Sequence, residues 1–155
     1  MVDYIANWQK NIPPNGRYSV DDAHFFLGLS IGELIINVPC NINIDYADYK
    51  YVFGKSKYVF ISSAINKDCS VAVKEAVDKV LDSNRSYARI LALAVVPKDC
   101  LLSSFNGLKL FNDSEVLYGI TLNESNNESY AILVCAETEK ATSKGVFLAG
   151  GLASV

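Results

Sequence analysis

The feature that most limits the fold is a nearly continuous apolar run at residues 88–96, which ends at Pro97. A run of this length without alternating polar residues is typical of a strand that is covered on both faces. The chain therefore needs apolar layers on either side of a sheet. Its 155 residues are 50% hydrophobic, which suits one domain with a full core and no structural metal or disulfide.

Other segments predict the remaining layers. Runs rich in β-formers predict further strands at 58–65, 116–122 and 130–136, and the polar link 123–129 predicts that the last two form an antiparallel hairpin. Caps and apolar residues at helical spacing predict helices at 19–36, 45–53, 68–83 and 101–111. Strand–helix–strand links imply parallel pairing through right-handed crossovers. The predicted fold is α+β, with a four-stranded mixed sheet packed against helices.

Composition shifts divide the chain into three parts. Residues 1–18 are predicted to be irregular, because Pro13-Pro14-Asn15-Gly16 is a turn signal. Residues 19–137 form the predicted domain. Residues 138–155 begin polar and later contain the apolar Val146-Phe147-Leu148 and the pair Gly150-Gly151, which predicts either a tail or an additional strand.

Charge and cysteine usage exclude several classes of function. The net charge is −3 and no basic stripe occurs, so nucleic acid and anionic membranes are poor partners. No segment resembles a signal peptide or a membrane span. The four cysteines, at 40, 69, 100 and 135, form no C-x-x-C pair, and a single histidine argues against zinc. We expect a cytoplasmic protein with reduced thiols.

An acidic motif, Asn43-Ile44-Asp45-Tyr46-Ala47-Asp48, follows Pro39 and opens the predicted second helix. Two carboxylates three residues apart at a helix start lie on one face of its first turn. One interpretation is a helix cap with a third-position acid, worth about 1 kcal/mol. The other is a pair of acids aimed at another molecule. The two are compatible, since a cap fixes the carboxylate that a partner would need.

The motif and the order of elements together resemble the C-terminal half of FtsZ, the bacterial tubulin-like division GTPase. The synergy loop of that family has the pattern N-x-D-F/Y-A-D after a proline-containing turn, as Asn43 to Asp48 do after Pro39. The preceding Ile31-Gly32-Glu33-Leu34-Ile35 is similar to the end of the family's long core helix. The resemblance covers residues 19–137 and implies a fold like the FtsZ C-terminal domain.

The resemblance also implies roles for the motif residues. FtsZ subunits stack head to tail, and the synergy loop of one completes the GTP site of the next. Asp45 and Asp48 would then be catalytic acids in trans, orienting water against the γ-phosphate. Asn43 would support them. Tyr46, Tyr49 and Lys50 would contact the partner, although ordinary packing also explains the tyrosines.

The phosphate-binding half of that family has no counterpart in this sequence. Neither G-x-x-x-x-G-K-S/T nor the family's G-G-G-T-G-T/S-G occurs, and the only adjacent glycines are Gly150-Gly151. We therefore expect no cofactor and no enzyme activity from this chain alone, with GTP present only on a partner chain. The expected partner is FtsZ, another tubulin-like GTPase, or a second copy of the chain.

Two functions from other classes stay open. A small α+β regulatory module would dimerise or bind a metabolite through its sheet edge or a helix face. A self-sufficient enzyme is the weaker alternative, because the sequence has one histidine, no G-x-S-x-G motif and no cluster of metal ligands.

Overall fold

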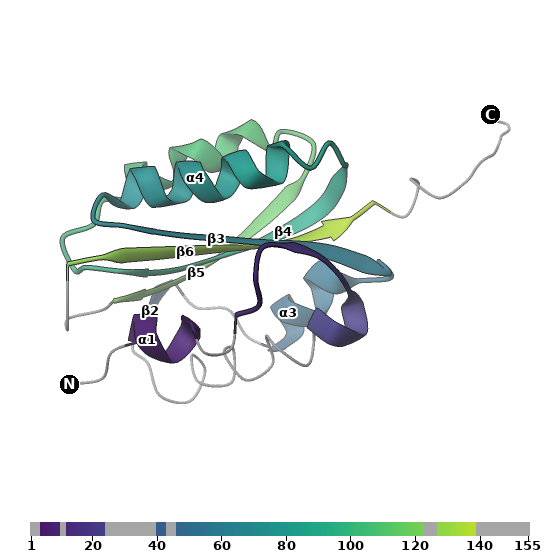
Figure 1. Cartoon of the computed structure of the whole chain (residues 1–155), viewed down its shortest axis with the longest axis horizontal. Helices are drawn as coiled ribbons and strands as arrows, with labels where there is room; N and C mark the ends of the chain where they lie inside the picture. The colour runs from purple at the N-terminus through teal and green to yellow at the C-terminus, as the bar shows by residue number, and fades with distance from the viewer. Residues whose placement is uncertain (1–3, 10–11, 24–39, 43–45, 123–126, 139–155) are drawn as a thin grey trace, which may run out of the picture.

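A computed structural model describes residues 4–9, 12–23, 40–42, 46–122 and 127–138. Its centre is a six-stranded mixed sheet with the strand order β1-β3-β6-β4-β5-β2. Figure 1 shows α4 on one face of this sheet, with α1 and α3 on the opposite face. The described part is thus a sheet between two layers, as the apolar run at 88–96 requires.

The elements follow the chain in a regular order. They are α1 (Tyr4–Gln9), β1 (Gly16–Ser19), β2 (Cys40–Ile42), α3 (Tyr46–Phe53), β3 (Tyr58–Asn66), α4 (Cys69–Leu81), β4 (Tyr87–Val96), the 3-10 helix η1 (Leu102–Leu110), β5 (Glu115–Leu122) and β6 (Ser129–Glu137). Among the described residues, no helix has the length and apolarity needed to cross a membrane.

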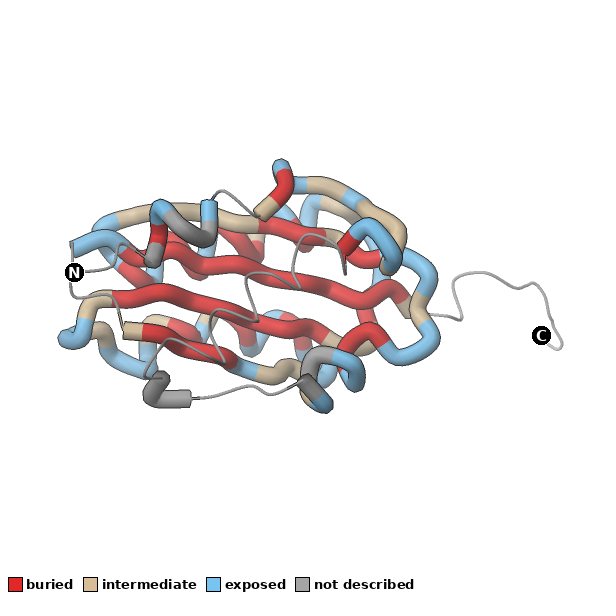
Figure 2. The backbone as a smooth tube through the Cα atoms, turned by 90° about the horizontal axis from the view of Figure 1, so that it is seen from below, coloured by how far each residue is buried: buried red, intermediate tan, exposed pale blue. Residues whose placement is uncertain are grey.

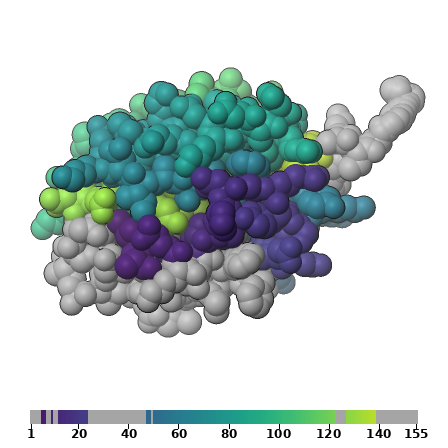
Figure 3. Space-filling view, viewed as in Figure 1, coloured from purple at the N-terminus to yellow at the C-terminus, as the bar shows by residue number. Residues whose placement is uncertain are grey.

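The predicted α+β fold with a mixed sheet is confirmed, and every strand predicted from residue 58 onward is present. The four predicted strands form the middle of the sheet, and the structure adds two short edge strands, β1 and β2. The prediction that residues 1–18 are irregular was wrong, because they contain α1 and most of β1. β1 has only four residues, too few for apolar and polar side chains to show the alternation of a strand. Its pairing with β3 is what makes this segment a strand. In Figure 3 the N-terminal segment, in purple, lies below α4, in teal.

The predicted hairpin between the last two strands was also wrong. β6 lies between β3 and β4 and is antiparallel to both, while β5 pairs with β4 in parallel. All nine residues of β6 are buried. A strand this apolar gains most at the centre of a sheet, where helices cover both faces. β4 therefore lies between β5 and β6, so these two strands do not form a hairpin. The parallel β4–β5 pair does confirm the predicted crossover through 101–111.

The core has two halves, one on each face of the sheet. Side chains of β4 alternate between them: Leu91, Leu93 and Val95 face the layer of α1 and α3, and their neighbours face α4. Figure 2 shows the central strands buried along most of their length. α3, which contains the last residues of the acidic motif, packs on the same face as Leu91, Leu93 and Val95.

The predicted helix 19–36 is described only at its start. Residues 20–23 are helical, and the Asp22 amide donates a hydrogen bond to Ser19 Oγ at 3.3 Å, so Ser19 caps the start of this helix. The rest of that helix, including its resemblance to the family's core helix, lies outside the described residues. So do residues 139–155 of the predicted tail.

Candidate functional site

The acidic motif lies between β2 and α3. β2 is an edge strand that pairs antiparallel with β5, and α3 begins at Tyr46. Asp48 is in the first turn of α3 and is half-buried, while Lys50 is exposed. Asn43 and Asp45 lie outside the described residues, and for Tyr46 and Tyr49 only the helical backbone is described. The helix start is thus found where it was predicted, and the roles of these six residues stay predictions.

α3 has one buried side and one exposed side. Val52 and Phe53 are 0% and 2% exposed and pack into the core cluster with β4 and β6. Ala47, Lys50 and Tyr51 are exposed. The exposed positions recur at three- and four-residue spacing, so they share one face of the helix. The helix that carries Asp48 is therefore anchored in the core and presents its other face outward.

The last turn of α3 is tied to the sheet by a charged cluster. The Tyr51 hydroxyl donates a hydrogen bond to Glu115 Oε1 at 2.7 Å. The Arg89 guanidinium lies 4.2 Å from the centre of the Tyr51 ring, within the range of a cation–π contact. Arg89 Nε is also 4.0 Å from Glu115 Oε1. These three residues, which we call the α3 clamp, join the helix to the first residues of β4 and β5.

Gly54 ends α3 beside this clamp. Its φ is +51°, in the left-handed region that glycine adopts without strain, and its amide donates to the Lys50 carbonyl at 3.0 Å. A Cβ at this position would lie 2.6 Å from Arg89 Nη1. α3 ends at Phe53, where the predicted range 45–53 also ends. The glycine both turns the chain and leaves room for the guanidinium that stacks on Tyr51.

A second charged cluster closes the other edge of the sheet. Glu137 is 8% exposed, and its carboxylate accepts two hydrogen bonds from Arg17, at 2.5 and 3.1 Å. Arg85 Nη1 lies 3.7 Å from the same carboxylate. The hydrogen bond to Glu137 raises the pKa of the Arg17 guanidinium. This cluster links the edge strand β1 to the end of β6.

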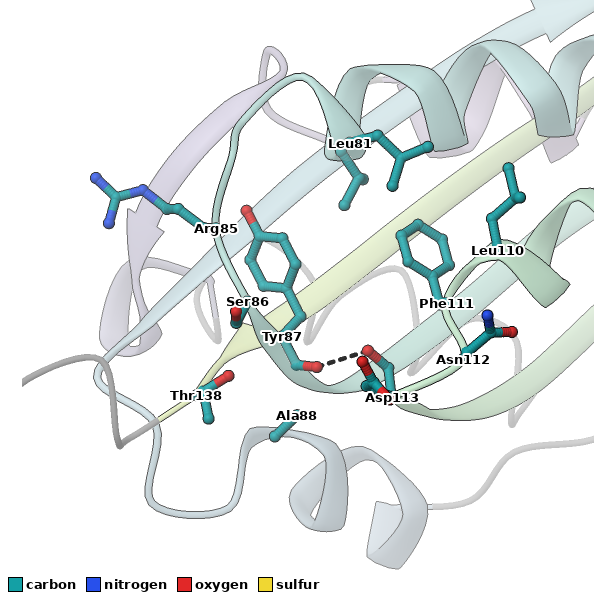
Figure 4. A pocket seen from close by; sticks show the side chains of 12 residues that line it. Leu81, Arg85, Ser86, Tyr87, Ala88, Leu110, Phe111, Asn112, Asp113 and Thr138 are labelled. Atoms are coloured by element: carbon teal, nitrogen blue, oxygen red, sulfur yellow. Dashed lines mark hydrogen bonds between the residues drawn. The ribbon is translucent and has the colours of Figure 1, made fainter.

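A cavity of about 520 Å³ lies where α4 and η1 end. Figure 4 shows the side chains of Leu81, Tyr87 and Phe111 around it, while Arg85 extends away. Burial raises the pKa of the Tyr87 hydroxyl, which shares a 2.7 Å hydrogen bond with Ser83 Oγ. None of the motif residues that the structure describes lines this cavity. Within the described ranges, no three His, Cys, Asp or Glu side chains are grouped as a metal site would require.

Comparisons with known proteins agree on the fold. No protein-family model matches the chain, and the search of the curated proteins found no match. A solved structure of an empty FtsZ dimer from M. jannaschii aligns with 77% of this chain and 38% of that chain, at 22% identity and a TM-score of 0.56. A single-residue FtsZ mutant from the same organism aligns with 77% and 40%, at 23% identity and a TM-score of 0.55.

These comparisons show an FtsZ-like α+β fold, which is the fold that the acidic motif implied. The chain spans about two fifths of the length of the FtsZ chains that it matches. The α3 clamp was missed by sequence reasoning. The one signal for it was Arg89, a charge inside an otherwise apolar strand, and nothing in the sequence connects that charge with Tyr51 or Glu115.

Proposed function

We propose that this chain is an FtsZ-like C-terminal domain that engages a tubulin-like GTPase longitudinally through residues 43–50 and has no enzyme activity alone. The observation that carries the proposal is the position of the motif N-I-D-Y-A-D, which leads directly into α3 within an FtsZ-like fold. The anchored side of α3 and its exposed opposite side support a role in docking.

In this proposal the acids act on a nucleotide that the partner brings. Asp45 and Asp48 orient water toward the γ-phosphate, and Asn43 supports them with a polar side chain. A positioned carboxylate of this kind accelerates proton transfer by about 10²- to 10⁴-fold. Tyr46, Tyr49 and Lys50 contact the partner around the acids. The half-buried position of Asp48 in the first turn supports this role, because a carboxylate held by the fold loses less freedom on docking.

GTP enters only on the partner, because the sequence has no phosphate-binding loop of either known pattern. A docked chain would offer acids to one neighbour without offering a nucleotide face to the next. It would then cap or modulate filaments in the cytoplasm, in cell division or a related process.

The test adds the purified chain to assembling FtsZ and follows light scattering and phosphate release. We expect a dose-dependent change in both, which Asp48→Ala abolishes. Asp99→Ala is the matched control, because Asp99 is an exposed carboxylate in the turn that follows β4 and lies outside both α3 and the lining of the cavity. No change at several-fold excess, or equal effects of the wild-type chain and Asp48→Ala, contradicts the proposal.

The cavity at the ends of α4 and η1 favours a second candidate function. Its volume of about 520 Å³ is in the range of small-molecule sites, about 300–1,000 Å³. A regulatory module that dimerises or binds a metabolite would use such a site. Static light scattering of the chain alone separates the two functions: a stable dimer without affinity for FtsZ supports the regulatory module.

A further inference from the structure

β3 is longer than the strand that covers its outer edge. It pairs with β6 over residues 59–66, whereas β1 pairs with it only over residues 58–61. The chain that leads into β1, in purple in Figure 1, meets β3 near the middle of that strand. Residues 62–66 therefore extend past β1, and none of the described strands pairs with them on this side. A strand edge of this kind is a template for pairing with another chain.

Two side chains occupy the main-chain groups of Ser63 on this side. The Ser63 amide donates a hydrogen bond to Asn15 Oδ1 at 2.7 Å. The Lys79 ammonium, which comes from α4, donates to the Ser63 carbonyl at 2.8 Å. Asn15 and Lys79 are both exposed. We call these two residues the β3 latch, because they take the positions where a neighbouring strand would form its hydrogen bonds.

The sequence before β1 explains why a side chain is needed here. Pro13 and Pro14 directly precede Asn15. If the register of β1 with β3 continued, Pro14 would be the residue opposite Ser63. Proline has no amide hydrogen to donate to a strand ladder. β1 therefore begins at Gly16, and the side chain of Asn15 supplies an acceptor to the next open position of β3.

The open stretch is suited to antiparallel pairing with itself. Main-chain groups alternate between the two sides of a strand, so those of Ile65 point to the same side as those of Ser63. Two copies related by a two-fold axis at Ala64 would place Ser63 of each copy opposite Ile65 of the other. Each of these pairs would exchange both of its main-chain hydrogen bonds. Side chains come closest at the axis, where Ala64 is small.

We propose that the β3 latch closes this edge against pairing with a second copy of the chain. A copy that pairs here must take both main-chain groups of Ser63 from the latch. It must also bring the Lys79 ammonium groups of the two copies toward the same axis, where like charges repel. None of the motif residues that the structure describes takes part in these contacts, so the inference is independent of the function proposed above.

Sedimentation velocity and amide hydrogen exchange of the full chain, from low micromolar to near-millimolar concentration, test the closure. We expect Asn15→Ala combined with Lys79→Met to move from 17.0 kDa toward twice that mass as concentration rises. Exchange of the Ile65 amide should slow in parallel, whereas in the wild-type chain it should not depend on concentration. Asn112→Ala combined with Lys74→Met is the matched control and should behave like wild type, because both residues are exposed and lie outside this edge.

Conservative variants test the two hydrogen bonds themselves. Asn15→Asp keeps an oxygen that accepts from the Ser63 amide, and Lys79→Arg keeps a donor for its carbonyl, so both should behave like wild type. At low concentration, Asn15→Ala should speed exchange of the Ser63 amide, which tests the latch in the monomer even where the double variant fails to fold.

Three results overturn the proposal. One is a folded double variant that stays monomeric at near-millimolar concentration. Another is a dimer of that variant in which exchange of the Ile65 amide is unchanged. The third is equal exchange of the Ser63 amide in the wild-type chain and in Asn15→Ala.

Discussion

Gly54→Ala tests the link between the end of α3 and the sheet. The residue has a φ of +51°, and a Cβ would lie 2.6 Å from Arg89 Nη1. The substitution therefore has two costs. Alanine must hold a left-handed backbone, and the guanidinium must leave the Tyr51 ring, from whose centre it lies 4.2 Å. Neither cost requires the loss of a buried apolar side chain.

The expected magnitude follows from these two terms. A left-handed conformation costs a residue with a Cβ about 1–2 kcal/mol, of which about 0.4–1 kcal/mol is offset by the lower entropy of the unfolded alanine chain. A lost cation–π contact at an exposed site adds about 0.5–1 kcal/mol. The net loss in the free energy of unfolding is about 1–2 kcal/mol. For a chain of this size the melting temperature falls by about 2–8 °C.

Urea unfolding followed by circular dichroism measures this loss. A double-mutant cycle with Arg89→Ala separates the two terms, because the steric displacement disappears when no guanidinium is present. We expect a coupling of about 0.5–1 kcal/mol, with the backbone strain remaining. Gly54→Asn should cost less than Gly54→Ala, since asparagine tolerates the left-handed region better. An unchanged stability of Gly54→Ala, or an equal cost in both backgrounds, would refute the reasoning.

Three further predictions concern burial and charge. Phe53→Ala should lower the free energy of unfolding by about 3–5 kcal/mol in urea, because the side chain is 2% exposed and anchors α3. Glu137→Gln should cost about 1–3 kcal/mol in the same assay, because it removes the carboxylate that accepts two hydrogen bonds from Arg17. The hydrogen bond from Ser70 lowers the pKa of the Asp68 carboxyl. The stabilisation that the ionised Asp68 carboxylate gives should therefore be complete above about pH 4 and should disappear as the pH falls through the lowered pKa. Thermal melts of wild type and Asp68→Asn should then converge in acid.

Long apolar patterns predicted the interior of the fold. The run at 88–96 became β4, the run at 130–136 became β6, and the helix predicted at 68–83 became α4, which Asp68 caps. The order of the strands in the sheet was harder to predict. An apolar sequence indicates that a strand is covered on both faces, but it does not indicate which strands lie beside it. β6 was therefore assigned to a hairpin that it does not form. β1 and β2 are too short to show a period.

The acidic motif was predictable because its residues are contiguous in sequence, and α3 begins within it. The α3 clamp was not, because Tyr51, Arg89 and Glu115 come from three separate elements. Their contact depends on the turn at Gly54 and on the parallel register of β4 with β5, where Arg89 is opposite Glu115. Such contacts form only in the completed fold, so no local sequence pattern predicts them.

The most direct measurement is an amide NMR titration of the isotopically labelled chain with GTP-bound FtsZ. Docking through the acidic motif predicts that shifts and line broadening concentrate in residues 43–51, with α4 unaffected, and that Asp48→Ala weakens them. An unchanged spectrum at saturating FtsZ, or changes confined to α4 and η1, would contradict the proposed function.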